Sequence, residues 1–244
     1  MNDEYLLVIP ARLLSKRLPN KPLLDFDGVP MIIATAINCA KIVPKKNIVI
    51  ATDSLKIKKI SKYYGFNCIL TSKKCLTGTD RVAEVAKKIK KKYYINLQGD
   101  EPVFDIKDIK KFINFAKKNK TDILNAYCSI KSKKEFESTN TPKVVFDNTN
   151  KLLYMSRGAT PGNKEKKFIC GFRQVCIYSF PRKKLFKFIK KKEKTFFEKI
   201  EDIEILRFLE IGEVVKMIKL SSNSVSVDTK EDYAKALKIY KKNH

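Results

Sequence analysis

The sequence predicts an α/β fold in which a mixed, mostly parallel sheet is flanked by helices. Through the first half of the chain, short apolar runs alternate with amphipathic stretches of about ten residues, a pattern typical of βαβ units. The chain has 244 residues, of which 43% are hydrophobic, and this is enough for one large core. From about residue 123, strand-like segments follow one another with short connections, which predicts a smaller antiparallel part.

The first half contains four predicted strands, each an apolar run that is too short for a buried helix. They span residues 6–9, 47–53, 66–70 and 93–97, and Pro10 is expected to end the first of them. Predicted helices span residues 31–42, 54–64 and 106–117. Another helix begins at 77–81, where Thr77 or Thr79 can act as the N-cap.

The second half has a different pattern, with strand-like segments at 124–130, 143–146, 152–155, 170–180 and 215–218. A turn at Asp147–Asn150 makes residues 143–155 a predicted hairpin. Helices are expected at 183–191 and 198–210, and a final helix opens at 228–232. We therefore expect an antiparallel insertion within one α/β domain.

Composition narrows the class of protein. The net charge is +26, but the lysines are spread along the whole chain, which favours solvated helix faces over a specific nucleic-acid interface. The single histidine is His244 and the six cysteines form no C-x-x-C pair, which disfavours a zinc site and excludes a Cys–His or Ser–His catalytic pair. The chain contains no run of about 18 apolar residues, so no membrane span is predicted. The acidic start is unlike a signal peptide, so a cytoplasmic protein is expected.

The loop after the first predicted strand carries three cations, Arg12, Arg17 and Lys21, and is stiffened by Pro19 and Pro22. Ligands bind at the carboxyl ends of strands in open α/β sheets. The loop has no glycine-rich cradle, so side chains would have to supply the positive charge for a polyphosphate. A basic surface loop is the alternative, but arginine is scarce in this chain and binds phosphate bidentately, which favours a phosphate site.

Two acidic segments could complete such a site. Asp100 follows the predicted strand 93–97, where a carboxylate is suited to Mg²⁺ beside nucleotide phosphates, although an ordinary acidic turn is the alternative. Asp228 lies in the segment Ser226–Thr229 and could simply cap the last helix. It becomes a second metal ligand only if the fold brings it near Asp100.

Taken together, these segments resemble one enzyme family. The order is I-P-A-R-x-x-S-x-R-L-P-x-K-P-L at 9–23, I-A-T-D at 50–53, G-T-D-R-x-A-E-V at 78–85, N-x-Q-G-D-E-P at 96–102 and V-D-T at 227–229. This pattern resembles the 3-deoxy-manno-octulosonate (Kdo) cytidylyltransferases, or CMP-Kdo synthetases, over nearly the whole chain. The resemblance implies a nucleotide-diphospho-sugar transferase fold with a smaller antiparallel dimerisation subdomain. It also implies one domain, 1–244, in which 1–122 and about 211–244 form the nucleotide-binding core and about 123–210 the sugar-binding and dimerisation part.

The resemblance also implies a reaction and a set of site residues. CTP would be coupled to a 2-keto-3-deoxy sugar acid with Mg²⁺ as cofactor, in a homodimer that serves lipopolysaccharide or capsule synthesis. The interface is expected at the hairpin 143–155 and the helix 198–210. The implied catalytic residues are Arg12, Lys21, Asp100 and Asp228, of which Asp100 and Asp228 are the metal ligands. The residues implied to contact CTP are Arg12, Arg17, Lys21, Asp53, Thr77 and Arg81. Those implied to contact the sugar acid are Gln98, Arg157, Gln174, Tyr178, Glu201 and Glu204.

The sugar side departs from the family pattern. The family's S-R-x-x-I-P-[WY] segment lacks its aromatic residue at Ser156–Gly162, Gln174 replaces a histidine, and Ile205 replaces a glutamine that would face the sugar. Loss of such a hydrogen bond discriminates strongly between substrates. The acceptor is therefore predicted to be Kdo or a close relative; an amino-modified ketosugar acid, another nonulosonate-type acid or a phosphonate is the alternative. The competing class is a basic nucleic-acid-binding protein or a regulator without catalysis.

Overall fold

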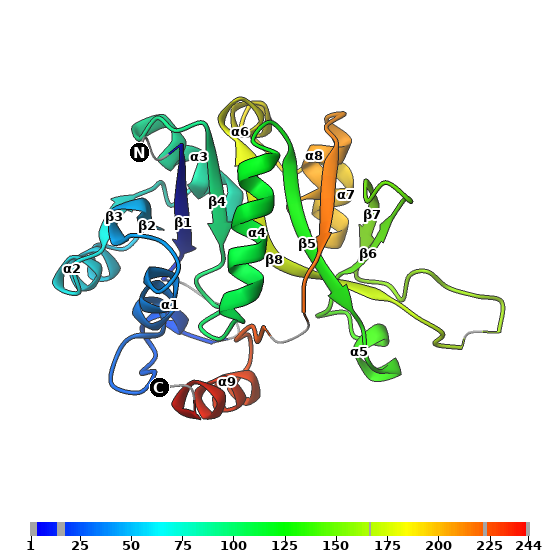
Figure 1. The fold of residues 1–244 in the computed structure, drawn as a ribbon, viewed down its shortest axis with the longest axis horizontal. Coiled ribbons are helices and arrows are strands. Elements are labelled where there is room, and N and C mark those ends of the chain that lie inside the picture. Colours follow the sequence, from blue (N-terminus) through cyan, green and yellow to red (C-terminus); the bar gives the residue numbers. More distant parts are fainter. Residues whose placement is uncertain (1–3, 14–17, 166, 222–223, 243–244) are drawn as a thin grey trace.

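The computed structural model describes residues 4–13, 18–165, 167–221 and 224–242, and these form a three-layer α/β/α arrangement (Figure 1). One nine-stranded sheet runs through it in the order β3-β2-β1-β4-β8-β5-β9, with β6 paired to β7 and β8. The strands are β1 (Tyr5–Ala11), β2 (Ile48–Thr52), β3 (Asn67–Leu70), β4 (Tyr93–Leu97), β5 (Ile123–Ser129), β6 (Lys143–Phe146), β7 (Leu152–Ser156), β8 (Phe172–Pro181) and β9 (Val215–Lys219).

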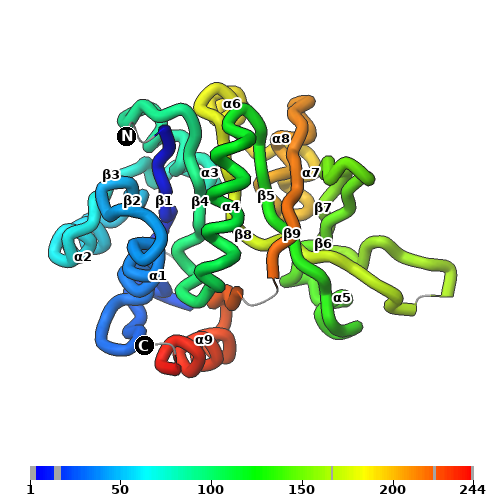
Figure 2. The backbone as a smooth tube through the Cα atoms, viewed as in Figure 1, coloured from blue at the N-terminus to red at the C-terminus, as the bar shows by residue number. Residues whose placement is uncertain are grey.

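Helices cover both faces of the sheet. They are α1 (Met31–Ala40), α2 (Leu55–Tyr63), α3 (Gly78–Lys88), α4 (Ile106–Lys118), α5 (Lys133–Glu137), α6 (Arg182–Phe188), α7 (Phe196–Glu201), α8 (Leu206–Glu210) and α9 (Lys230–Lys242). One hydrophobic cluster packs α1, α2 and α4 against the sheet, and a second packs α3, α6 and α8 against the other face. A third, smaller cluster holds α9 against α1, as Figure 2 shows. In the part of the chain that the structure describes, no helix is long and apolar enough to cross a membrane.

The predicted mixed, mostly parallel sheet is confirmed. Strands β1 to β4 are parallel, β8 is antiparallel to both β4 and β5, and β9 is parallel to β5. The predicted hairpin 143–155 is present as the antiparallel pair β6–β7. Both β5 and β8 fall in the segment 123–210 yet continue the main sheet, so the division of the domain into core and insertion stays a prediction.

Two local expectations were wrong, and one short helix was not predicted. Strand β1 continues through Pro10 to Ala11, which is tolerated because its pairing with β4 ends at Val8 and Pro10 is paired only with β2. The predicted helix 198–210 is two short helices, α7 and α8, because the intervening Asp202 adopts a left-handed conformation with φ of 51°. Helix α5, which the periodicity did not indicate, is a single short turn capped by Ser132.

Parallel order places the carboxyl ends of β1, β2 and β4 at one edge of the sheet. The loops that follow β1 and β4 contain the predicted phosphate residues and the predicted metal ligand Asp100, whereas Asp228 lies in the segment before α9. Gly99 allows the loop after β4 to turn close to β1, because a Cβ at this position would lie 2.8 Å from the Pro10 carbonyl oxygen. The fold therefore brings three distant loops together at the edge where α/β proteins bind ligands.

Candidate active site

Lys21, Asp100 and Asp228 meet at this edge of the sheet. The Lys21 ammonium donates to Asp100 Oδ2 at 2.6 Å, to Asp228 Oδ1 at 3.1 Å and to the Val227 carbonyl oxygen at 2.8 Å. Burial opposes the charged form of Lys21, but the two carboxylates outweigh it, and the pKa of Lys21 is raised. Residues that are 79 and 207 positions from Lys21 in the sequence thus form one cluster.

Backbone pairing fixes the two aspartates relative to each other. The Val227 amide donates to the Asp100 carbonyl oxygen at 2.9 Å, and the Val225 amide donates to the Val103 carbonyl oxygen at 3.0 Å. This short antiparallel bridge joins the loop after β4 to the segment before α9. The proximity of Asp228 to Asp100, which the sequence left open, is therefore present.

The donor set suits a hard divalent cation that keeps other ligands. The side chains of Asp100 and Asp228 are 32% and 31% exposed, so both carboxylates remain open to solvent. Among the described residues, no group of three or more His, Cys, Asp or Glu side chains could hold a metal by itself. Mg²⁺ is commonly held by one or two carboxylates together with waters and phosphate oxygens, and this pair fits that pattern.

Asp53 and Arg81 form a second ion pair beside this cluster. Arg81 Nη2 lies 2.7 Å from Asp53 Oδ2, and Arg81 Nη1 donates to Thr71 Oγ1 at 2.7 Å. Asp53 Oδ1 accepts from the Leu13 amide at 3.4 Å, so the pair links the loop after β1 to β2 and α3. Arg81 is buried and committed to these partners in the structure.

Of the other residues predicted to bind CTP, Arg12 and Thr77 are described and Arg17 is not. Arg12 is exposed at the carboxyl end of β1, while Arg17 lies outside the described residues. Thr77 is the N-cap of α3, and its side chain accepts from the Asp80 amide at 3.3 Å. The Asp80 carboxylate closes a capping box, because the Thr77 amide donates to Asp80 Oδ2 at 2.8 Å.

Gln98 and Glu204 are brought together on the α3 side of the sheet. Gln98 Nε2 donates to Glu204 Oε1 at 3.3 Å, and the Thr79 amide donates to Glu204 Oε2 at 3.0 Å. Burial raises the pKa of Glu204. Glu204, predicted to face the sugar acid, therefore also binds the first turn of α3.

Arg157 and Glu201 form another contact set at the end of β7. Arg157 Nε donates to the Glu201 carbonyl oxygen at 2.5 Å, and the Arg157 amide donates to Glu201 Oε2 at 2.7 Å. Ser156 Oγ also donates to Glu201 Oε1 at 2.9 Å. The two residues are thus adjacent, as the implied sugar-acid site requires.

Gln174, Tyr178 and Ile205 are buried. Gln174 Nε2 donates to Asn125 Oδ1 at 3.1 Å between β8 and β5. Burial raises the pKa of Tyr178 well above its usual value. Ile205 is fully buried in the hydrophobic cluster that packs α3, α6 and α8 against the sheet. The structure therefore places these three side chains in the interior, apart from the exposed carboxylates at the strand ends.

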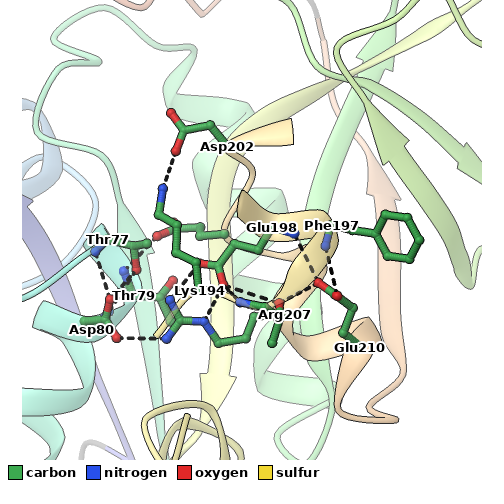
Figure 3. Close-up of polar contacts among 11 residues, drawn as sticks. Thr77, Thr79, Asp80, Lys194, Phe197, Glu198, Asp202, Arg207 and Glu210 are labelled. Carbon is green, nitrogen blue, oxygen red and sulfur yellow. Dashed lines mark hydrogen bonds and ion pairs between the residues drawn. The ribbon is translucent and has the colours of Figure 1, made fainter. Parts of the chain in front are cut away.

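Sequence reasoning missed a buried ionic cluster of Arg207, Glu198 and Asp80, shown in Figure 3. Arg207 contacts Glu198 through two hydrogen bonds of 2.6 Å and Asp80 through one of 3.1 Å. The spacing of Thr77 and Asp80 could have revealed the capping box. Nothing in the periodicity indicated that Arg207 would be buried, because the pattern predicts only one continuous helix over 198–210.

Most of the chain also matches known proteins in sequence. The cytidylyltransferase family model matches residues 6–219. The chain is 38% identical to a 3-deoxy-manno-octulosonate cytidylyltransferase of Nitratiruptor sp. over 94% of this chain and 97% of the relative. It is 35% identical to the one of Rickettsia typhi over 99% of both. The chain belongs to the cytidylyltransferase family.

Solved structures agree with this membership. A CMP:2-keto-3-deoxy-manno-octonic acid synthetase complexed with CTP superposes with a TM-score of 0.90 at 28% identity, covering 99% of this chain and 100% of that one. A glucose-1-phosphate thymidylyltransferase of Bacillus anthracis, at 16% identity and a TM-score of 0.70, shows the same fold. The cytidylyltransferase fold predicted from the motifs is therefore confirmed.

Proposed function

We propose that this cytidylyltransferase couples CTP to Kdo, giving CMP-Kdo and pyrophosphate. The observation that carries the proposal is the cluster of Lys21, Asp100 and Asp228 at the carboxyl end of the sheet. One buried cation and two partly exposed carboxylates suit a nucleotide triphosphate with a divalent cation. The curated relatives with this name and the synthetase solved with CTP support the substrates.

The chain's own residues account for the chemistry without a histidine. The anomeric hydroxyl oxygen of the sugar acid bonds to the α-phosphorus of CTP and loses its proton to solvent. The bond between the α-phosphorus and the oxygen that bridges it to the β-phosphorus breaks, and pyrophosphate leaves. Lys21, with Arg12 and Arg17, would neutralise the triphosphate and the departing charge, since such transfers depend mainly on positioning and electrostatics. Asp100 and Asp228 would hold Mg²⁺, which when bound supplies further charge neutralisation.

Kdo is favoured over a modified acceptor. The replacement of a family glutamine by Ile205 was the sequence ground for a different sugar acid, but Ile205 is fully buried among apolar side chains. Arg157 lies against Glu201 at the end of β7, where its guanidinium supports binding of an acceptor carboxylate. CMP-Kdo made in the cytoplasm would then serve lipopolysaccharide or capsule synthesis.

A homodimer is part of the proposal. An exposed apolar face joins β7 and α7, formed by Leu153, Phe196, Phe197 and Ile200, of which Phe196 is 69% and Ile200 64% exposed. Tyr154 extends this face, because its ring centroid lies 5.8 Å from that of Phe197. Apolar patches of this kind mark protein interfaces. Ile200→Asp should shift the sedimentation profile from dimer to monomer, and a wild-type protein that sediments as a monomer at micromolar concentration would contradict the interface.

The reaction is tested by pyrophosphate release from CTP in the presence of Mg²⁺ and a panel of sugar acids. Release should depend on Kdo, and Asp100→Asn should reduce it by at least about 100-fold while the protein stays folded. Asp122→Asn is the matched control, because Asp122 pairs with Lys216 at the amino end of β5, away from the strand ends of the site. A thermal shift with ATP or UTP but not with CTP would overturn the nucleotide assignment. Turnover with another acid but not with Kdo would overturn the acceptor.

A further inference from the structure

The segment 201–207, hereafter the clasp, joins α7 to α8 and reaches three other parts of the molecule. Three of its four charged side chains, Glu201, Glu204 and Arg207, are spaced three residues apart, but they do not share one helix face, because the fourth, Asp202, breaks the helix. Glu201 contacts the end of β7, Glu204 contacts the start of α3 and the end of β4, and Arg207 contacts α3.

On the nucleotide side, the clasp holds the first turn of α3. Asp80 uses its two carboxyl oxygens for different partners: Oδ2 accepts from the Thr77 amide at 2.8 Å, and Oδ1 accepts from Arg207 Nη1 at 3.1 Å. Glu204 adds a second attachment through the Thr79 amide. Arg81, which follows Asp80 in the sequence, forms the ion pair with Asp53. The turn that carries Thr77 and Arg81, which the family resemblance implies to contact CTP, is thus tied to the clasp at two points, of which Figure 3 shows the contact between Asp80 and Arg207.

The attachment at Arg207 is rigid. The Arg207 and Glu198 side chains are fully buried and joined bidentately, and the guanidinium carbon lies 3.8 Å from the centre of the Phe188 ring. Glu198 also accepts from the Thr195 amide at 3.1 Å. A planar guanidinium held at two nitrogens has a fixed orientation, so the third nitrogen defines where Asp80 can lie.

On the sugar side, the clasp holds Arg157. Its amide and Nε are bound by the Glu201 carboxylate and carbonyl oxygen, and Nη2 donates to the Asp202 carbonyl oxygen at 3.1 Å. The orientation of the Arg157 guanidinium is therefore set by two backbone oxygens of the clasp and by the Thr139 carbonyl oxygen, which accepts from Nη1 at 2.9 Å. A displacement of the clasp would move Arg157 and the first turn of α3 together.

We propose that the clasp couples the CTP subsite to the sugar-acid subsite, with Arg207 acting through Asp80, and Glu201 acting on Arg157, as positioning residues. The inference rests on the proposed function, because it takes its two subsites from there. Arg207 acts on the first turn of α3 and Glu201 acts on Arg157, and these two segments are implied to contact CTP and the sugar acid. Energetic coupling between sites can be carried by such a connected, well-satisfied network.

The first experiment compares Asp80→Asn, Glu201→Gln, the double variant and Asp122→Asn. Asp80→Asn keeps the buried Arg207–Glu198 pair and an oxygen that can accept from Thr77, so the fold is retained. It should raise the KM for CTP about tenfold with kcat within about twofold, whereas Glu201→Gln should raise mainly the KM for Kdo. In the double variant, the combined loss in kcat/KM should differ from the product of the single losses. Unchanged KM values with only a lower melting temperature, or strictly multiplicative losses, would overturn the proposal.

A second experiment needs no substrate. Hydrogen exchange of the amides 77–81 is measured for the full-length variants in the absence of ligand. Glu201→Gln should accelerate exchange in this turn, although the Glu201 carboxylate binds Tyr154, Ser156 and Arg157 on the β7 side, while Asp122→Asn should leave it unchanged. Exchange at 77–81 equal to wild type in Glu201→Gln would overturn the coupling. Failure of wild type to use CTP with Kdo would instead contradict the proposed function. The exchange result would still test whether the clasp is coupled to the turn 77–81, because it needs no substrate.

Discussion

The molecule contains two ionic clusters that each join one cation to two carboxylates but differ in their surroundings. The open cluster is Lys21 with Asp100 and Asp228, at 2.6 and 3.1 Å. The closed cluster is Arg207 with Glu198 and Asp80, again at 2.6 and 3.1 Å. The carboxylates of the open cluster are about one-third exposed, whereas Arg207 and Glu198 are completely buried. Distance alone therefore does not separate a ligand site from a structural one.

Burial and the type of cation do separate them. In the closed cluster, water cannot replace a lost partner, and the bidentate guanidinium leaves one geometry for Glu198. In the open cluster, the ammonium is a point charge on a flexible stem, and both aspartates can turn to solvent, to a metal ion or to phosphate-bound water. The closed cluster is suited to holding segments in place, and the open cluster is suited to exchanging partners.

Arg207→Met should give the largest effect, on stability. The variant leaves the Glu198 carboxylate buried without its cation, which typically costs about 3–5 kcal/mol. Urea denaturation followed by circular dichroism measures the free energy of unfolding. The variant Arg207→Met/Glu198→Leu removes both charges and should recover most of the loss, since replacing a buried pair by apolar groups is often close to neutral. A double variant no more stable than Arg207→Met would break the comparison, because the unpaired charge would not be the cause.

Lys21→Met should give the reverse pattern, with a large effect on activity and a small one on stability. Removal of the ammonium should reduce CTP-dependent pyrophosphate release by at least about 100-fold, as for loss of a charge-stabilising donor. The free energy of unfolding should fall by about 1 kcal/mol or less, because solvent reaches both carboxylates. Kinetics and urea denaturation on the same preparation measure the two quantities.

The same variant tests whether the open cluster exchanges partners. Lys21 lies between the two proposed metal ligands, so its removal should strengthen binding of Mn²⁺, the spectroscopic probe for Mg²⁺, in the absence of nucleotide. Titration of free Mn²⁺ by electron paramagnetic resonance measures this. Weaker Mn²⁺ binding in Lys21→Met than in wild type would show that the ammonium does not compete for the carboxylates.

The open cluster could be predicted from the sequence because its parts are local. Lys21 lies in a proline-stiffened loop after a strand, and Asp100 follows an apolar run, so each has a recognisable setting. Their meeting with Asp228 was left open by the sequence, because it depends on the backbone bridge between Val103 and Val225. The alternation of strands and helices predicted the parallel part of the sheet, and the turn at Asp147–Asn150 predicted the β6–β7 hairpin.

The closed cluster could not be predicted, because it depends on packing between elements. The periodicity of 198–210 fits one helix, and only the left-handed backbone of Asp202 turns Arg207 towards α3 and α6. The burial of Gln174 and Tyr178 has the same origin: β8 is inserted between β4 and β5, a position that sequential order does not reveal. Local patterns indicate which residues could react, and tertiary packing decides which of them are accessible.

Glu101 sharpens the comparison, because it is adjacent to Asp100 but is buried like the closed cluster. Burial, reinforced by the charge of Asp100, raises the pKa of Glu101 from 4.5 to about 7. Between about pH 4.5 and pH 7, Glu101 keeps its proton in the folded protein but loses it in the unfolded chain. The contribution of Glu101 to stability is therefore fully present below about pH 4.5 and is lost as the pH rises to about 7. The shift corresponds to about 3 kcal/mol.

Glu101→Gln should remove this dependence, because the amide stays neutral throughout. The difference in free energy of unfolding between the variant and wild type, measured by urea denaturation at pH 5 and pH 8, should move in favour of the variant at pH 8 by about 2–3 kcal/mol. Taking the difference at each pH cancels the titration of other groups. An equal difference at both pH values would mean that burial does not raise the pKa of Glu101 in the folded protein.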